Sequence, residues 1–173
     1  SAEEVKEELK RIATKLKEEI KENIRRLEES VEKIAKELAE NIKRLEDILR
    51  DVKRGLRDER IVKTVEDIAR RVVEDNERIM EEDKDVVRRL VERNEEIVRR
   101  VDETVKKIVE LIDRGEPGEE LVERLRRVVE EVRERLKDSS RELRKINEDS
   151  RKAVEDSSAE VAKVVEELER RDT

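Results

Sequence analysis

The sequence repeats every eighteen residues, and this spacing limits what the chain can fold into. Residues 58–111 divide without a gap into DERIVKTVEDIARRVVED, NERIMEEDKDVVRRLVER and NEEIVRRVDETVKKIVEL. Residues 4–57 and 119–172 divide in the same way. Because eighteen residues make five turns of an α-helix, equivalent residues of successive repeats point in the same direction. The repeat therefore predicts straight helices without the left-handed supercoil that a heptad repeat imposes.

The apolar residues follow the helical period. In the first repeat of residues 58–111 they occupy one arc of about 140° on a helix, and they are Ile61, Val62, Val65, Ile68, Ala69, Val72 and Val73. Charged residues make up 55% of the chain and aromatic residues are absent, a composition that can indicate disorder. Since the apolar period is strict and the chain has only three Gly and one Pro, we instead expect long helices.

Three helices are predicted, over residues 2–54, 59–114 and 117–171, each about 53 residues long. Long helices joined by short turns pack antiparallel in succession. The predicted fold is therefore an all-α, straight antiparallel three-helix bundle. The chain length fits a single domain, which we assign to residues 1–173.

The predicted turns carry residues typical of helix ends. Ser1 and Asp58 are of residue types whose side chains commonly cap helix N-termini. Gly55 is typical of a Schellman C-terminus, in which Gly adopts a left-handed backbone. The second helix is expected to end at Gly115, and Pro117 suits the first position of the third.

Polar residues interrupt the apolar arcs where a core helix normally carries Leu or Ile. When two antiparallel helices are joined by a short turn, residues at the same height along the bundle have numbers with a constant sum. That sum is about 115 for the first two predicted helices and about 233 for the last two. The polar positions follow both relations and form three layers. The first layer is Asn23, Asn94, Ser139 and Ser140, the second is Ser30, Asp83, Asn147 and Ser150, and the third is Asn41, Asn76, Ser157 and Ser158.

The layers have a physical reason. A buried Asn or Ser is costly when it is alone and is tolerated when a partner lies at its own height. We therefore expect hydrogen bonds within each layer that specify which helices pair and at what register.

Asp83 is the ionisable residue at the centre of an apolar arc. It has two interpretations: an acceptor of hydrogen bonds from Ser30, Asn147 and Ser150, or a small cation or proton site. The first is favoured because hydroxyl and amide donors are expected around the carboxylate. Burial is expected to raise its pKa, since a desolvated carboxylate disfavours the charged form.

The sequence lacks the residues that most classes of catalytic and binding chemistry require. Without His or Cys, zinc ligation, nucleophilic dyads and imidazole acid–base catalysis are not available, so no catalytic, metal or cofactor site is predicted. The three Gly are turn residues and form no phosphate loop. Mixed charges without aromatic residues do not favour nucleic acid, and no apolar run could span a membrane. A small-molecule ligand is not expected either.

The chain resembles computationally designed helical bundles with buried hydrogen-bond networks. The resemblance covers the whole chain and lies in its undrifting repeat, minimal turns, Glu/Lys/Arg-rich surfaces and matched polar layers. It implies a scaffold without a natural substrate, either alone or as one chain of a designed assembly, and it carries no catalytic motif with it.

Two functions remain open from the sequence. The favoured one is a monomeric, non-enzymatic structural scaffold, because each apolar arc is wide enough for two neighbouring helices. The alternative is an interaction module, in which a second copy or a partner helix completes the polar layers. The Ser-rich middle of the third helix favours this alternative. No targeting signal is visible and a soluble chain is expected, while its location in a cell is left open.

Overall fold

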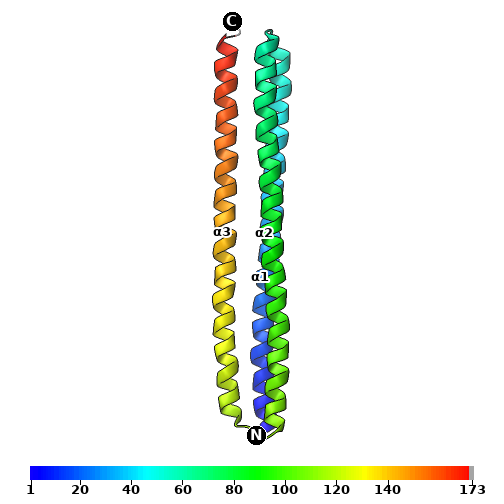
Figure 1. Cartoon of the computed structure of the whole chain (residues 1–173), viewed down its shortest axis with the longest axis vertical. Helices are drawn as coiled ribbons and strands as arrows, with labels where there is room; N and C mark the ends of the chain where they lie inside the picture. Colours follow the sequence, from blue (N-terminus) through cyan, green and yellow to red (C-terminus); the bar gives the residue numbers. More distant parts are fainter. Residues whose placement is uncertain (172–173) are drawn as a thin grey trace. The chain divides into compact units, whose positions relative to one another are not determined.

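The computed structural model describes residues 1–171, and these form three long helices (Figure 1). Helix α1 spans Ala2–Gly55, α2 spans Glu59–Asp113 and α3 spans Gly118–Arg171. The helices pack against one another as an all-α three-helix bundle, which confirms the predicted fold class. Their bounds lie within one residue of the predicted ones.

Residue contacts group the chain into two compact units. Unit 1 comprises Ser1–Glu29 and Val87–Leu143. Unit 2 comprises Ser30–Val86 and the described residues from Arg144 onward. Each unit therefore contains a segment of every helix and has its own core.

Ion pairs between helices give the helix directions within unit 1. Lys6 pairs with Asp113 and Lys17 with Asp102, so the numbers fall along α2 as they rise along α1. These two segments are antiparallel. On the other side of α1, Glu8 pairs with Arg126 and Glu19 with Arg133, so the α1 and α3 segments run in the same direction.

The first two helices begin with the predicted capping bonds. The Glu4 backbone N–H donates to Ser1 Oγ at 3.3 Å, and the Arg60 backbone N–H donates to Asp58 Oδ1 at 2.9 Å. Each bond satisfies a backbone N–H of the first helical turn, and such N–H groups have no carbonyl partner within the helix.

The Schellman geometry occurs at Gly115, not at Gly55 as predicted. Gly115 has a φ of 89°, its N–H donates to the Ile112 carbonyl, and the Glu116 N–H donates to the Leu111 carbonyl. At Gly55 the prediction was wrong, because the backbone there stays helical and the following Leu56 N–H donates to the Val52 carbonyl at 2.9 Å. Glycine permits the left-handed backbone without requiring it.

This difference predicts opposite effects for two glycine substitutions. Gly115→Ala should lower the free energy of unfolding by about 1 kcal/mol, because an L side chain is strained at positive φ. Gly55→Ala should be neutral or should stabilise by up to about 1 kcal/mol, because Ala favours a helix and open space surrounds the position. Chemical denaturation followed by circular dichroism measures both. Destabilisation by both substitutions would contradict the helical backbone of Gly55.

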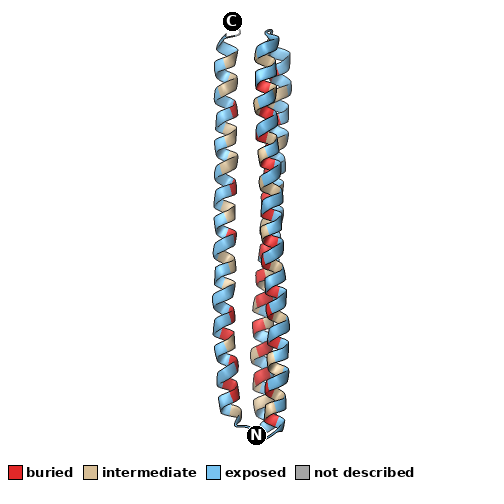
Figure 2. Ribbon diagram, in the orientation of Figure 1, coloured by how far each residue is buried: buried red, intermediate tan, exposed pale blue. Residues whose placement is uncertain are grey.

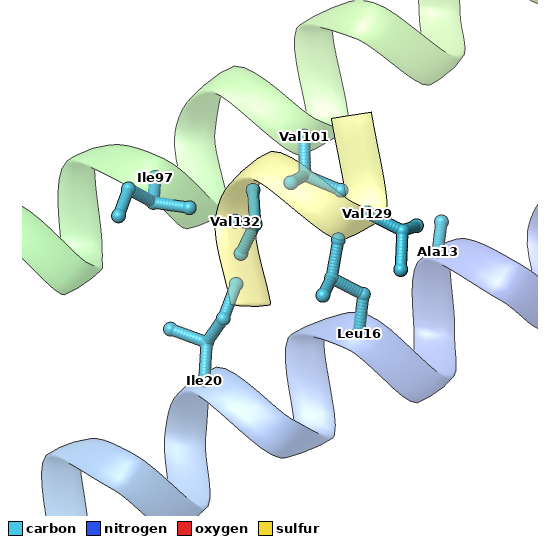
Figure 3. Close-up of a cluster of buried hydrophobic side chains, with 7 residues drawn as sticks. All are labelled: Ala13, Leu16, Ile20, Ile97, Val101, Val129 and Val132. Carbon is cyan, nitrogen blue, oxygen red and sulfur yellow. The ribbon is translucent and has the colours of Figure 1, made fainter. Parts of the chain in front are cut away.

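The core of unit 1 is built from all three helices. One cluster of buried side chains lies between them (Figure 3), with Ala13, Leu16 and Ile20 from α1, Ile97 and Val101 from α2, and Val129 and Val132 from α3. A second cluster contains Leu9, Ile108, Ile112, Leu121, Val122 and Leu125. Both clusters receive apolar side chains from every helix, so burial of apolar surface holds the three segments together.

The core of unit 2 receives little from α3. The α3 segment of unit 1 buries six apolar side chains: Leu121, Val122, Leu125, Val129, Val132 and Leu143. Figure 2 shows where buried residues lie along each helix. In the described α3 segment of unit 2, Val161 is the only apolar side chain that is buried. It packs with Leu45 of α1 and Val72 of α2. Apolar burial therefore holds α3 less strongly in unit 2 than in unit 1.

Candidate functional site

The predicted polar layers lie inside the two units. The first layer belongs to unit 1, and the second and third belong to unit 2. Six of the twelve side chains are buried: Asn23, Asn41, Asn76, Asp83, Asn94 and Ser150. The other six, all serines apart from Asn147, are half-buried.

In the first layer, side chains of all three helices are joined by hydrogen bonds. Asn23 Nδ2 donates to Asn94 Oδ1 at 3.2 Å, and Ser140 Oγ donates to Asn23 Oδ1 at 3.5 Å. Asn94 Nδ2 turns back to the Leu90 carbonyl of its own helix at 2.7 Å. Ser139 lines an open groove between α2 and α3 and has no bond to Asn94, so it takes no part in the hydrogen bonds predicted for this layer.

The third layer is the same arrangement moved by one repeat along each helix. Ser158 Oγ donates to Asn41 Oδ1 at 2.9 Å, and Asn76 Nδ2 donates to the Val72 carbonyl at 3.0 Å. Ser157 donates to the Ala153 carbonyl. The counterpart of the bond between Asn23 and Asn94 is missing, because Asn41 Nδ2 and Asn76 Oδ1 are both buried without a partner.

The second layer contains the buried carboxylate. Ser150 Oγ donates a hydrogen bond to Asp83 Oδ2. Neither of the other two predicted donors, Ser30 and Asn147, forms a hydrogen bond with Asp83. Ser30 lines a groove between α1 and α3, and the Oδ1 acceptor of Asn147 is buried without a partner. Burial raises the pKa of Asp83, while the Ser150 hydrogen bond acts in the opposite direction. The nearby charges of Glu82 and Asp149 raise this pKa further.

The raised pKa predicts a pH-dependent effect of Asp83→Asn. Because the folded protein holds this proton more tightly than the unfolded chain, the ionised carboxylate reduces stability at pH values above its folded pKa. That cost fades as pH falls through the folded pKa towards the unfolded value of about 3.9. Asp83→Asn should thus be neutral or stabilising at pH 7 and should gain little near pH 3. Denaturant titrations of both proteins at the two pH values measure this, and a clear loss at pH 7 would show that the layer needs the ionised group.

Sequence reasoning missed the bonds that polar side chains make to their own helix. Asn94, Asn76 and Ser157 each donate to the carbonyl four residues earlier. This carbonyl is always within reach of a short polar side chain in a helix. The position of each residue inside a predicted helix could therefore have indicated these bonds. These bonds satisfy groups that were expected to bond across helices.

The charged surface forms ion pairs between helices as well as within them. In unit 1, Arg133 of α3 donates two hydrogen bonds to Glu19 of α1, both at 3.1 Å. Glu19 raises the pKa of Arg133 by stabilising its charged form. Lys17 and Asp102 join α1 to α2 at 2.8 Å. Such exposed pairs contribute at most about 1 kcal/mol each, so they assist the packing of the helices without determining it.

Within residues 1–171, no cluster of three or more His, Cys, Asp or Glu side chains is arranged to hold a metal ion. No helix in this part of the chain is long and apolar enough to cross a membrane. Comparison with protein families, curated proteins and solved structures gave no match to the chain.

Proposed function

We propose that the chain is a structural scaffold whose buried polar layers specify helix pairing and register, and that it is a designed helical bundle with hydrogen-bond networks. The observation that carries this proposal is the set of hydrogen bonds between helices, each of which involves a buried side chain. Asn23 bonds to Asn94 and Ser140 in unit 1. In unit 2, Asp83 bonds to Ser150 and Asn41 bonds to Ser158. Each bond joins two helices at one height.

The physical basis is that a wrong helix register costs more free energy at buried polar side chains than at apolar ones. Apolar side chains can exchange neighbours with little loss when a helix slides by one turn, because dispersion and burial are non-directional. A buried carboxamide that loses its partner costs about 1–3 kcal/mol. Several such groups at fixed heights therefore disfavour every slipped arrangement, as a single buried Asn does in coiled coils.

Trapping of helix register by disulfides tests this role. The chain has no cysteine, so cysteine pairs can be introduced freely. Lys17→Cys with Asp102→Cys reports the native register, because these side chains meet across α1 and α2. Lys17→Cys with Lys106→Cys reports a slip of about one turn.

In the otherwise unchanged protein, we expect rapid disulfide formation only for the native pair. When the buried Asn and Asp residues of the layers are all replaced by Leu, the slipped pair should form as well, while stability is kept or increased. If only the native pair still forms, the polar layers do not determine register. The substituted residues are Asn23, Asn41, Asn76, Asp83 and Asn94.

A second candidate function is an interaction module. Three buried polar atoms without partners favour it: Asn41 Nδ2, Asn76 Oδ1 and Asn147 Oδ1, all in unit 2. Buried groups of this kind are normally paired, so a partner helix inserted among the helices of unit 2 would supply the missing donors and acceptors. Sedimentation velocity at two protein concentrations tests self-association. A constant mass of one chain supports the scaffold, and a mass that rises with concentration supports a module that binds its own copies.

A further inference from the structure

Helix α3 covers its neighbours differently in the two units. On α1 both units bury similar sets of apolar side chains, namely Leu9, Ala13, Leu16, Ile20 and Leu27 in unit 1 and Ile34, Leu38, Leu45 and Val52 in unit 2. On α3 the sets differ, because the described part of unit 2 buries Val161 where unit 1 buries six apolar side chains. A similar face of α1 is thus covered by a much less apolar segment of α3 in unit 2.

The repeat identifies positions of α3 that cause this difference. Ser157 occupies the position of Leu121 two repeats later, and Asn147 occupies the position of Val129 one repeat later. Leu121 and Val129 are both buried. Ser139, at the Leu121 position of the second repeat, lines a groove of about 350 Å³ between α2 and α3 in unit 1. A serine at this position therefore leaves space that a leucine fills.

The polar groups at these two positions are not used to join helices. Ser157 donates to the Ala153 carbonyl of its own helix, and Asn147 Oδ1 is buried without a partner. Burial of apolar surface is given up at both positions, and the hydrogen bonds seen there do not compensate by linking α3 to another helix. The α3 segment of unit 2, residues 144–171, is therefore not the helix that would cover α1 and α2 best.

Two other serines of this segment do join helices. Ser150 donates to Asp83 of α2, and Ser158 donates to Asn41 of α1. Asp83 and Asn41 are buried, so any helix that lies on this face needs hydroxyl groups opposite both of them. The two serines are eight residues apart, which defines the spacing of those groups.

The remaining contacts allow the segment to separate from a pair of helices that stays together. Its ion pair with α2, between Arg71 and Glu160, joins exposed side chains and adds little stability. The α1 and α2 segments have contacts of their own in unit 2, because Leu45 packs with Val72 and Lys53 pairs with Glu66 at 3.0 Å. Local opening of a weakly packed segment, with its neighbours still folded, is the expected behaviour.

We propose that the face of α1 and α2 under residues 144–171 binds an amphipathic helix from a separate chain, which takes the place of this α3 segment. The partner helix carries Leu at the Ser157 position, Val at the Asn147 position, and serine at the positions of Ser150 and Ser158. It buries more apolar surface than α3 does there and keeps both hydrogen bonds between helices. The inference rests on the interaction-module candidate and is independent of the role of the layers in register.

A second copy of this chain is a poorer source of the partner helix. The segment of the chain with the required apolar residues is the α3 segment of unit 1, and its Leu121 and Leu125 are 2% and 0% exposed. A copy would have to unfold its own unit 1 to offer them. The partner is therefore a helix that is not already packed in a core.

Two labelled peptides test the proposal on the full chain. Both span residues 144–171, and one of them carries Asn147→Val and Ser157→Leu. Fluorescence anisotropy should show that the substituted peptide binds at least about tenfold more tightly, because it brings two more apolar side chains to the face. The unsubstituted peptide has no advantage over the tethered segment, whose high effective concentration favours the closed chain.

A cross-link locates the binding. The chain has no cysteine, so Arg71→Cys and Glu160→Cys can be joined by a short bismaleimide that holds α3 on α2. The substituted peptide should bind before this cross-linking and not after it. The matched control joins Glu19→Cys to Arg133→Cys, which meet in unit 1, and should leave binding unchanged.

The same two substitutions in the chain itself give a reciprocal test. Asn147→Val with Ser157→Leu strengthens the tethered segment, so it should weaken binding of the substituted peptide roughly tenfold. Circular dichroism confirms that this variant is folded. The comparison of the two peptides on the unsubstituted chain needs no variant to fold.

Several outcomes would overturn the proposal. They are no saturable binding of either peptide, equal binding of both, or binding that persists after residues 71 and 160 are joined. Loss of binding on joining residues 19 and 133 would place the site in unit 1 and contradict it as well. The register experiment is read without a peptide, so its result is separate from each of these.

Discussion

Leu125→Ala is expected to lower the free energy of unfolding by about 2–5 kcal/mol, the largest effect of any single substitution considered for this chain. Leu125 is 0% exposed and packs in unit 1 with Leu9, Ile108 and Leu121. Truncation removes buried apolar surface and leaves a cavity between three helix segments that cannot easily collapse. Chemical denaturation followed by circular dichroism at 222 nm measures the loss.

The matched control is Leu168→Ala in unit 2. Leu168 is half-buried on the described α3 segment of unit 2, which contributes one buried apolar side chain. Its truncation should cost less than about 1.5 kcal/mol, because little surface returns to water and no enclosed cavity forms. Equal losses for the two leucines would mean that α3 is packed as firmly in unit 2 as in unit 1.

Asn94→Ala is expected to cost about 1–3 kcal/mol. Asn94 is 1% exposed, and its Oδ1 is the acceptor for Asn23 Nδ2. Removing the carboxamide leaves that buried donor without a partner, and an unpaired buried donor loses its hydration without compensation. If denaturation shows no change, Asn23 has found water or another acceptor and the first layer is not closed.

Asn76→Ala serves as the control because it removes the same side chain from the equivalent position one repeat earlier. Asn76 is equally buried, but its Oδ1 accepts no bond and its Nδ2 bonds only within α2. No other side chain loses a partner when it is truncated. Its cost should therefore be smaller than that of Asn94→Ala, and the difference between the two variants measures the bond between Asn23 and Asn94.

The helices and the heights of the polar groups could be predicted because both follow from the period. A repeat with no angular drift keeps each apolar arc on one side of its helix, and short turns set which residues of neighbouring helices share a height. Asn23 with Asn94, Asp83 with Ser150, and Asn41 with Ser158 follow from these two conditions. Side-chain chemistry need not be known for this step.

The individual bonds could not be predicted in the same way. Asn23 and Asn41 are equivalent in the repeat, yet only Asn23 donates to the facing Asn. Hydrogen bonds need distances held to a few tenths of an ångström, whereas a residue pattern determines height and face alone. The separation of two helices depends on the apolar side chains packed between them, and unit 2 has few from α3. The same limit applies to Gly55, whose sequence permits a left-handed backbone that its turn does not use.

The Asn bonds of the first layer have a direction. The Ser140 hydroxyl of α3 donates to Asn23 of α1, whose amide donates to Asn94 of α2, whose amide donates to a carbonyl of its own helix. All the donor groups of this chain of hydrogen bonds thus point in the same direction, from α3 through α1 to α2. If α1 and α2 exchanged places, Ser140 would face Asn94, whose Oδ1 already accepts from Asn23, and Asn23 Oδ1 would lose its donor. The three helices are similar in length and surface, but they are not interchangeable. The order of donors and acceptors in the first layer favours one arrangement of the helices over the others.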